Sequence, residues 1–131
     1  MKLAIMQPYF FPYAGYFSLA CYADEFILFD TPQYDRKGWM HRNRILSPAA
    51  GWQYIHAGVR KPEFRASIKS VMLDPDEGWK TTLLAQLDHY RNKARYFSNV
   101  LDLLQEMLAY PATTLAELIR LHSPKSCIVS E

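Results

Sequence analysis

The hydrophobic positions of this 131-residue chain predict a strand, a helix and a second strand at its N-terminus. Residues 3–6 form a short apolar run that stops at Gln7 and Pro8, as expected for a buried strand. Residues 14–23 are apolar on nearly every face, which predicts a well-buried helix. Residues 26–29 form a second apolar run of strand-favouring residues. This spacing predicts a parallel strand–helix–strand unit whose two strands end side by side.

The middle of the chain carries two further strand patterns and one segment without a pattern. Residues 52–59 and, more weakly, 67–73 are expected to be strands. Residues 33–45 mix basic, aromatic and polar side chains with no clean period, which is typical of a solvated loop. A solvated loop explains Arg42, Asn43 and Arg44 less well, because ordering three such side chains in a row is costly unless they bind a ligand.

Helical periodicity dominates the second half. A first helix is expected to begin with Asp74 as its N-cap, Pro75 as its first residue and Glu77 completing a capping box, and to continue to about residue 97. A second covers 96–110, and a third runs from the capping box of Thr114 and Glu117 to residue 119. The tail after Pro124 is expected to be a short last strand or a disordered end.

Together these elements predict one α/β domain over residues 1–131. The expected architecture is a small parallel or mixed sheet of about four strands with a Rossmann-like βαβ start, flanked by helices. Half of the residues are apolar and the charge is moderate, which excludes a disordered chain. No apolar run approaches the length of a membrane span, so membrane insertion is not expected. Cys21 and Cys127 make a weak case for a disulfide, which favours a reduced, cytoplasmic protein.

The positive charge is concentrated in the middle of the chain. The net charge is only +2, yet residues 36–69 carry eight Lys and Arg side chains against Glu63 alone. A basic segment between near-neutral or acidic flanks predicts an anionic partner, here a nucleotide or a sugar phosphate. Basic residues among aromatic ones can also bind nucleic acid, but the acidic flanks and the lack of a known binding module make this the less favoured alternative.

Several common catalytic chemistries leave no trace in the sequence. The four histidines and two cysteines lack metal-ligand spacing, so no metal is expected. The chain has no P-loop, no GxGxxG fingerprint and no GxSxG nucleophile elbow. Cys21 lies among apolar neighbours, where a reactive thiolate is disfavoured.

Two motifs of this chain resemble the WbqC-like family of bacterial proteins: the opening IMQPYFFPYAGYFSL, and GWMHRNRIL with the QY that precedes it. The resemblance covers roughly residues 1–119 and implies a role in making O-antigen and related surface polysaccharides, where an amino-acid (glycine) transferase activity has been suggested. The chain departs from the family at Thr31, where members often carry a second acid, and at His41, where they often carry Asn. Members look longer, so the resemblance implies truncation after about residue 119.

The candidate site is the cleft at the carboxyl ends of the first two strands, roofed by the basic segment. Residues 13–16 stand where nucleotidylyl transferases and pantothenate synthetase carry H-x-G-H, with tyrosines in place of both histidines. Asp30 is the expected general base, Gln33 is expected to orient an acceptor hydroxyl or amine, and His41 is a further catalytic candidate. The residues expected to bind a nucleotide or sugar phosphate are Gln7, Pro8, Tyr13, Gly15, Tyr16, Tyr34, Lys37, Trp39, Arg42, Asn43, Arg44 and Lys61.

The sequence and the resemblance together predict a transferase of surface-polysaccharide biosynthesis that moves an acyl, aminoacyl or nucleotidyl group to a sugar-linked acceptor. No side chain has the setting of an activated nucleophile, so direct transfer from an activated donor is expected. ATP or a nucleotide-sugar is expected as a substrate, and no resident cofactor is assigned. The alternative is a non-catalytic domain that binds a nucleotide or sugar phosphate. The donor, the acceptor and the oligomeric state stay open.

Overall fold

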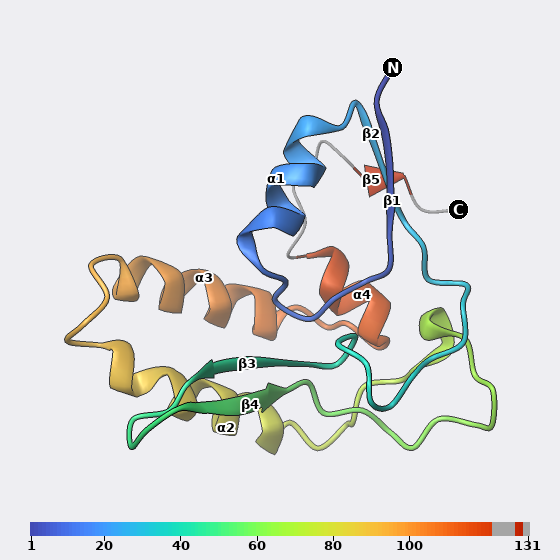
Figure 1. The fold of residues 1–131 in the computed structure, drawn as a ribbon. Coiled ribbons are helices and arrows are strands. Elements are labelled where there is room, and N and C mark those ends of the chain that lie inside the picture. Colours follow the sequence, from blue (N-terminus) through green and yellow to red (C-terminus); the bar gives the residue numbers. More distant parts are fainter. Residues whose placement is uncertain (122–127, 130–131) are drawn as a thin grey trace.

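A parallel strand–helix–strand unit opens the fold in the computed structural model, which describes residues 1–121 and 128–129 (Figure 1). Strand β1 (Leu3–Met6) pairs in parallel with β2 (Glu25–Leu28), and α1 (Ala14–Tyr22) connects them. The pairing expected between the first two apolar runs is therefore confirmed. Strand β5 (Ile128–Val129) pairs in parallel with β2 on its other side, in the order β1-β2-β5. The predicted last strand is present there, and the rest of the tail lies outside the described residues.

Helix α1 is less buried than its apolar sequence predicts. Only Tyr16 and Ala20 of the helix are buried, whereas Cys21 and Tyr22 are exposed. The buried pair faces the narrow sheet, and in the described part of the chain no element encloses the opposite side of α1. The expectation of a well-buried helix is wrong, because apolar residues on every face do not ensure that other elements pack against every face.

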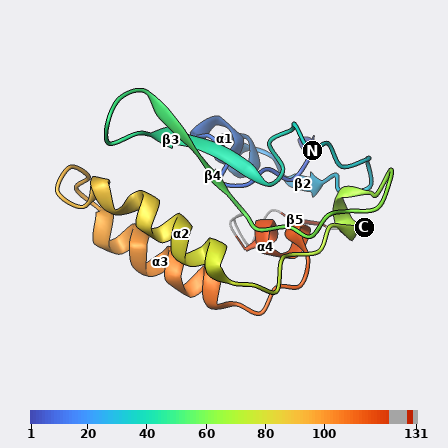
Figure 2. The ribbon, with the colours of Figure 1, turned by 90° about the horizontal axis from the view of Figure 1, so that it is seen from below.

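A β-hairpin makes a second sheet, separate from the first (Figure 2). Strands β3 (Arg42–Leu46) and β4 (Trp52–His56) pair antiparallel, with Arg44 opposite Tyr54. Gly51 closes the turn with a φ of 69°, a conformation that glycine adopts without strain. The strand predicted at 52–59 is confirmed over its first five residues, but 33–45 is only partly a loop because it contains most of β3. The fold is thus mixed α/β with two small sheets instead of one.

The strand expected at 67–73 is wrong. The segment forms the short 3₁₀ helix η1 (Ile68–Ser70) and joins its neighbours only through isolated bridges. Ile68 and Val71 are both fully buried, and their three-residue spacing puts them on one side of a helical turn. The Ile68 N–H donates to the Pro32 carbonyl at 2.9 Å, so this segment lies against the chain that follows β2.

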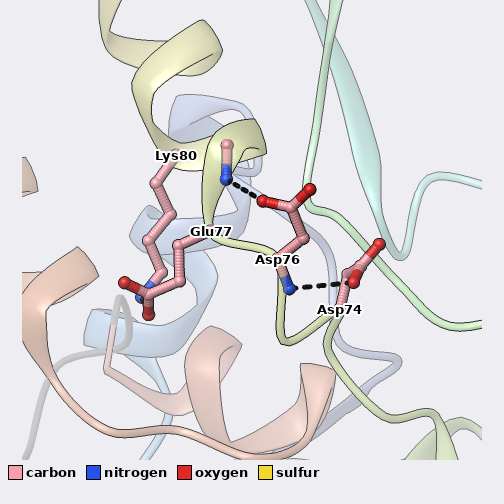
Figure 3. A network of polar contacts seen from close by, with 5 residues as sticks. Asp74, Asp76, Glu77 and Lys80 are labelled. Atoms are coloured by element: carbon pink, nitrogen blue, oxygen red, sulfur yellow. Dashed lines mark hydrogen bonds and ion pairs between the residues drawn. The ribbon is translucent and has the colours of Figure 1, made fainter.

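Helix α2 (Gly78–Leu87) begins later than predicted, and the proposed capping box is absent. The Asp74 carboxylate accepts from the Asp76 N–H, and the Asp76 carboxylate accepts from the Gly78 N–H, each at 3.0 Å (Figure 3). Glu77 forms an ion pair with Lys80. Side chains of Asp that bond backbone two residues ahead stabilise turns in competition with helix, so the helix starts only at Gly78.

Two more α-helices follow α2 in the described part of the chain. The helix predicted to run to residue 97 stops earlier: α2 passes into the 3₁₀ helix η2 (Asp88–Tyr90), and α3 (Phe97–Ala109) follows after a turn. The last helix, α4 (Leu115–Arg120), has its predicted capping box, since the Thr114 side chain accepts from the Glu117 N–H and Glu117 reaches back to the Thr114 N–H. None of the described helices is both long and apolar enough to cross a membrane.

The buried side chains form two hydrophobic clusters. The smaller one, here called the N-terminal core, lies between α1, β1 and β2 and includes Tyr16 and Phe26. The larger one, here called the main core, is built around α4, whose Leu115, Leu118 and Ile119 are almost fully buried. The hairpin, η1 and helices α2 and α3 contribute the rest of the main core. The loop that leaves β1 joins the two clusters, because Phe10 belongs to the main core.

Candidate functional site

A pocket of about 440 Å³ opens where β1 ends. Its walls come from the end of β1, the aromatic loop that follows it, and the start of the hairpin. Three of its lining residues were predicted for the site, namely Tyr13, Trp39 and Asn43, and the others are Met6, Tyr9 and Pro12. The pocket therefore lies at the carboxyl end of a parallel strand and beside the first turn of α1, as the sequence predicts for a ligand site.

Hydrogen bonds to backbone groups hold the aromatic loop, residues 7–13, in one conformation. The Tyr16 hydroxyl donates to the Gln7 carbonyl at 3.0 Å from a side chain that is almost fully buried. Burial is the main reason that the Tyr16 pKa lies far above its ordinary value of 10, so the hydroxyl keeps its proton. The Phe10 N–H donates to the Trp39 carbonyl at 3.3 Å and so ties the loop to the opposite pocket wall. Tyr16 and Gln7 thus support the loop that lines the pocket and do not line the pocket themselves.

Asn43 fixes the most strained part of this loop. Its Nδ2 donates to the carbonyl oxygens of Phe10 and Phe11 at 3.2 and 2.6 Å, and its Oδ1 accepts from the Arg44 N–H at 2.7 Å. Phe11 has a φ of 46°, a left-handed conformation that a bulky side chain rarely adopts. One amide therefore holds a turn that would otherwise relax, which explains why Asn stands at this position.

Gly15 and Pro8 have steric roles beside the pocket. A Cβ on Gly15 would lie 2.5 Å from Cε2 of Tyr13, so glycine leaves the space in which the Tyr13 ring lies. Pro8 is fully buried and ends β1, because proline has no N–H to continue the ladder. Tyr13 is 67% exposed, which leaves most of its surface free for a ligand.

Arg42, Asn43 and Arg44 do not act as one cluster, because they alternate along a strand. Arg42 and Arg44 lie on the outer face of the hairpin, opposite His56 and Tyr54 in the strand register, whereas Asn43 points to the pocket and loop. The Arg42 Nη2 donates to the Lys37 carbonyl at 2.6 Å and its Nε to the Gly38 carbonyl at 3.2 Å. Arg42 is therefore largely used in closing the preceding loop.

Arg44 is held by aromatic rings and keeps free hydrogen-bond donors. Its guanidinium carbon lies 4.2 Å from the centre of the Trp52 ring and 5.0 Å from that of Trp39. Its only described hydrogen bond from the side chain is a long one of 3.5 Å to the Tyr54 hydroxyl, and no described carboxylate forms an ion pair with it. Stacking fixes the plane of the guanidinium and leaves its N–H edges for an anion. Trp39 links this cation to the pocket, since it lines the pocket and contacts Arg44.

His41 and Tyr34 form a hydrogen-bonded pair near the base of the hairpin. The Tyr34 hydroxyl lies 2.7 Å from His41 Nδ1. Burial, with smaller contributions from His56 and Arg42, lowers the His41 pKa to about 4, so its imidazole is neutral at neutral pH. Burial also raises the pKa of Tyr34. The pair can position a proton at neutral pH but carries no charge.

The remaining predicted site residues lie outside this pocket. Gln33, Tyr34 and Lys61 line a separate hollow of about 330 Å³ together with residues of the 62–66 segment. Lys37 is exposed, and its N–H donates to the Asp35 carboxylate at 2.8 Å. Asp30 is 4% exposed, and its carboxylate accepts from Arg120 Nη2 at 3.2 Å in an ion pair with α4. The structure therefore does not gather the predicted residues in one site: some line two separate hollows, Asp30 is in an ion pair, and the rest lie in the aromatic loop, in α1, on the hairpin or in the loop before it.

Sequence reasoning missed several residues of this region. Tyr9 and Met6 line the pocket. The density of aromatic residues in the opening motif pointed toward Tyr9, whereas no sequence signal singled out Met6. Trp52 and Tyr54 hold Arg44, a role that could be seen only once Arg42–Leu46 was recognised as their partner strand. Arg120 pairs with Asp30 across ninety positions of sequence, and no local signal links them. No group of three or more His, Cys, Asp or Glu side chains within the described residues could hold a metal ion.

Comparison with known proteins gives the family. The model of the WbqC-like protein family matches residues 7–127. The uncharacterized protein Rv1507c of Mycobacterium tuberculosis (strain ATCC 25618 / H37Rv) is 34% identical over 104 residues, which is 79% of this chain and 44% of the relative. The chain thus spans less than half the length of that relative, and no solved structure matches it. The chain belongs to the WbqC-like protein family.

Proposed function

We propose that this chain is a cytoplasmic WbqC-like transferase domain that binds an activated, nucleotide-type donor in the pocket at the end of β1. The transferred group would be an acyl, aminoacyl or nucleotidyl group, and the acceptor a sugar-linked hydroxyl or amine in surface-polysaccharide biosynthesis. The observation that carries the proposal is the pocket of about 440 Å³, lined by Tyr9, Tyr13 and Trp39, of which the Trp39 ring also contacts the guanidinium of Arg44. Aromatic walls suit a planar base, and a guanidinium suits a phosphate.

The arrangement of the chain around the pocket supports an anion there. The chain starts with a parallel strand–helix–strand unit, and its first helix begins at Ala14, directly after the pocket residue Tyr13. Helix N-termini carry unpaired N–H groups and a partial positive charge that favour phosphates. Arg44 lies across Trp39 with donors to spare, whereas the donors of Arg42 already bind loop carbonyls. We therefore assign the main anion contact to Arg44.

Among the three predicted catalytic side chains, His41 is the one whose chemistry best suits accepting a proton, and it lies outside the pocket lining. The Asp30 carboxylate is engaged by Arg120, and the Gln33 amide is no base. His41 is unprotonated at neutral pH, but a pKa of about 4 makes it a weak base. Such a group suits orienting an acceptor hydroxyl or amine in a direct transfer, where the donor already carries the leaving group.

A second function, binding without turnover, is favoured by one specific observation. The only buried carboxylate in the described residues, Asp30, is occupied by an ion pair instead of facing the pocket. A domain with this geometry would bind a nucleotide or sugar phosphate and need further residues for chemistry. The two candidates share the pocket and differ only in turnover.

Ligand binding tests the proposal directly. A thermal-shift screen of ATP, aminoacyl-adenylate analogues and nucleotide-sugars should find a ligand that raises the melting temperature, since a ligand at a hundred times its Kd adds about 2.7 kcal/mol to the free energy of unfolding. Titration calorimetry with that ligand should then give roughly fivefold weaker binding for Tyr13→Ala, because ring contacts contribute about 1 kcal/mol. Tyr22→Ala is the matched control, because Tyr22 is also 67% exposed and lies at the far end of α1.

A second pair of variants tests the cation. Arg44→Ala should weaken binding more than Arg95→Ala, in which an exposed arginine is likewise removed from an aromatic ring, that of Tyr96. A ligand that binds equally well to the Tyr13, Arg44 and control variants would place the site elsewhere. If no compound in the screen raises the melting temperature of the folded protein, the nucleotide-donor proposal fails.

A further inference from the structure

The segment between β4 and η1 forms a protruding loop that has no part in the pocket at the end of β1. In Figure 2 this part of the chain runs out to the end of the molecule away from the α2–α3 connection. Its base is held on both sides, because the Arg60 N–H donates to the Met72 carbonyl at 2.9 Å and the Tyr34 N–H to the Ala66 carbonyl at 2.8 Å. Residues 60–66, here called the basic turn, are therefore a clamped loop.

The tip of the basic turn places an aromatic ring in solvent. The Ala66 N–H donates to the Glu63 carbonyl at 3.2 Å and closes a four-residue turn around Phe64 and Arg65. Phe64 is 89% exposed, more than any other large hydrophobic residue of the described part of the chain except the N-terminal Met1. Arg65 has a φ of 61°, a conformation that is unfavourable for a residue other than glycine. The strained backbone at Arg65 opposes folding, and the exposed Phe64 ring contributes no burial that would offset the strain, which indicates that the tip is shaped for a partner.

The charges around the tip define that partner as anionic. Arg60, Lys61 and Arg65 are all exposed, and Glu63 is the only acid among them. None of these three cations forms an ion pair within the described residues. Two hollows of about 330 and 380 Å³ flank the turn, and Lys61 lines both. Each hollow offers a place for a phosphate-sized group beside a cation.

We propose that the basic turn is a peripheral anchor for an anionic lipid surface, with the Phe64 ring inserted among the headgroups and the three cations on lipid phosphates. Aromatic insertion and basic charge are the two signals that together give stable surface binding. A free phosphate would explain the cations but leaves the exposed ring without a role. A protein partner would need a broad contact of about 800 Å² on each side, which a single narrow tip does not offer. The anchor touches the membrane and does not span it, and it is independent of the proposed nucleotide site.

Vesicle binding by the full chain tests the anchor. Sedimentation with vesicles of phosphatidylcholine and phosphatidylglycerol should recover the protein, and pure phosphatidylcholine vesicles should not. Phe64→Ala should raise the lipid concentration for half-binding about tenfold, the lower end of what burial of a Phe ring contributes. Binding should also weaken as salt is raised, because the cations act through a screened surface potential. Phe64 is almost fully exposed, so its replacement leaves the fold intact.

A tryptophan probe reports the insertion itself. In Phe64→Trp, after subtraction of the wild-type signal, the added tryptophan should shift its emission to shorter wavelength on anionic vesicles. Tyr96→Trp is the matched control, since Tyr96 is 62% exposed and has Arg95 stacked on it, as Phe64 has Arg65. Tyr96 belongs to the α2–α3 connection, at the other end of the molecule from the basic turn. The anchor is refuted by equal recovery on neutral vesicles, by unchanged binding of Phe64→Ala, or by an equal emission shift in the control. A competition experiment adds inorganic phosphate at constant ionic strength. If the phosphate abolishes vesicle binding, the cations belong to a free-phosphate site and the anchor is also refuted.

Discussion

At the scale of single residues, His41 should make the stability of the fold depend on pH. Its pKa falls from 6.5 to about 4 in the folded chain, because burial and the neighbouring His56 and Arg42 disfavour the imidazolium. Below pH 6.5 the unfolded chain takes up a proton that the folded chain refuses, so the free energy of unfolding decreases as the pH falls. The decrease ends near pH 4, where both states are protonated.

Urea unfolding of the wild type and of His41→Gln, between pH 7.5 and 4.5, measures this contribution. The difference between the two curves isolates His41 from the carboxylates that titrate in the same range. The wild type should lose more stability than the variant as the pH falls from 6.5, and His56→Gln should reduce the same loss to a smaller extent, because its pKa is also lowered by burial. Parallel curves for wild type and His41→Gln would show that the buried imidazole is not the source.

Other residues show how far sequence reasoning reaches at this scale. Tyr13, Trp39 and Asn43 were predicted for the site and do line one pocket, because the motif that singled them out surrounds the end of β1. The sequence predicted that Arg42, Asn43 and Arg44 bind an anion together. The strand alternation shows that Asn43 points to the aromatic loop, whereas Arg42 and Arg44 lie on the opposite face of the hairpin. A side chain's direction depends on its secondary structure, so a polar run read as a loop cannot be divided into faces.

At the scale of elements, the sequence predicted a helix start correctly where all the groups that form it are close in sequence and have one role. The capping box of α4 was readable because all of its groups lie within four residues. The start of α2 was misplaced because Asp74 and Asp76 are good caps and equally good turn formers, and the sequence does not say which role they take. The hairpin was missed because β3 has polar side chains on both faces, so it lacks the alternation that marks a strand.

The cap of α4 gives the prediction at this scale. Thr114→Ala removes the acceptor of the Glu117 N–H at 3.2 Å and should lower the free energy of unfolding by about 1 kcal/mol. The effect should be global, because the residues that follow the cap are the centre of the main core. Urea unfolding followed by far-UV circular dichroism measures it.

Thr81→Ala on α2 is the control for the cap. Thr81 is an exposed helix residue, so alanine there should leave the stability unchanged or raise it slightly through helix propensity. In the double variant of Thr114→Ala with Glu117→Gln, the two losses should not add, since both side chains belong to one reciprocal cap. Equal stability of the Thr114→Ala and Thr81→Ala variants would mean that the cap contributes nothing.

At the scale of the whole molecule, the chain is two hydrophobic clusters joined at a few points. The parallel unit was predictable from the spacing of apolar runs, since its strands and helix are consecutive. The main core was not, because it gathers the hairpin, η1 and three later helices from across the sequence. The ion pair of Asp30 and Arg120 joins the end of β2 to α4, and so connects the unit that carries the pocket to the main core.

This connection gives Asp30 a structural role that competes with the catalytic role proposed from the sequence. Asp30 is 5% exposed in its side chain and Arg120 36%, so the loss on breaking the pair should lie below the 3–5 kcal/mol of a fully buried one, at about 1–3 kcal/mol. Arg120→Met should be the more destabilising change, because it leaves a buried carboxylate without its cation. Asp30→Asn keeps the shape of the side chain, and its amide oxygen can still accept a hydrogen bond from the guanidinium. The loss in the free energy of unfolding should therefore be smaller for Asp30→Asn.

A double-mutant cycle of Asp30→Asn and Arg120→Met, measured by urea unfolding at pH 7, should show coupling between the two changes. If Asp30 serves only to join the two clusters, Asp30→Asn should leave the Kd of the pocket ligand unchanged at a temperature where the variant is folded, and any turnover should persist. A general base behaves in the opposite way: its replacement abolishes turnover with little change in stability. Loss of turnover in Asp30→Asn, with an unchanged free energy of unfolding and no coupling to Arg120, would therefore show that Asp30 is catalytic and not structural.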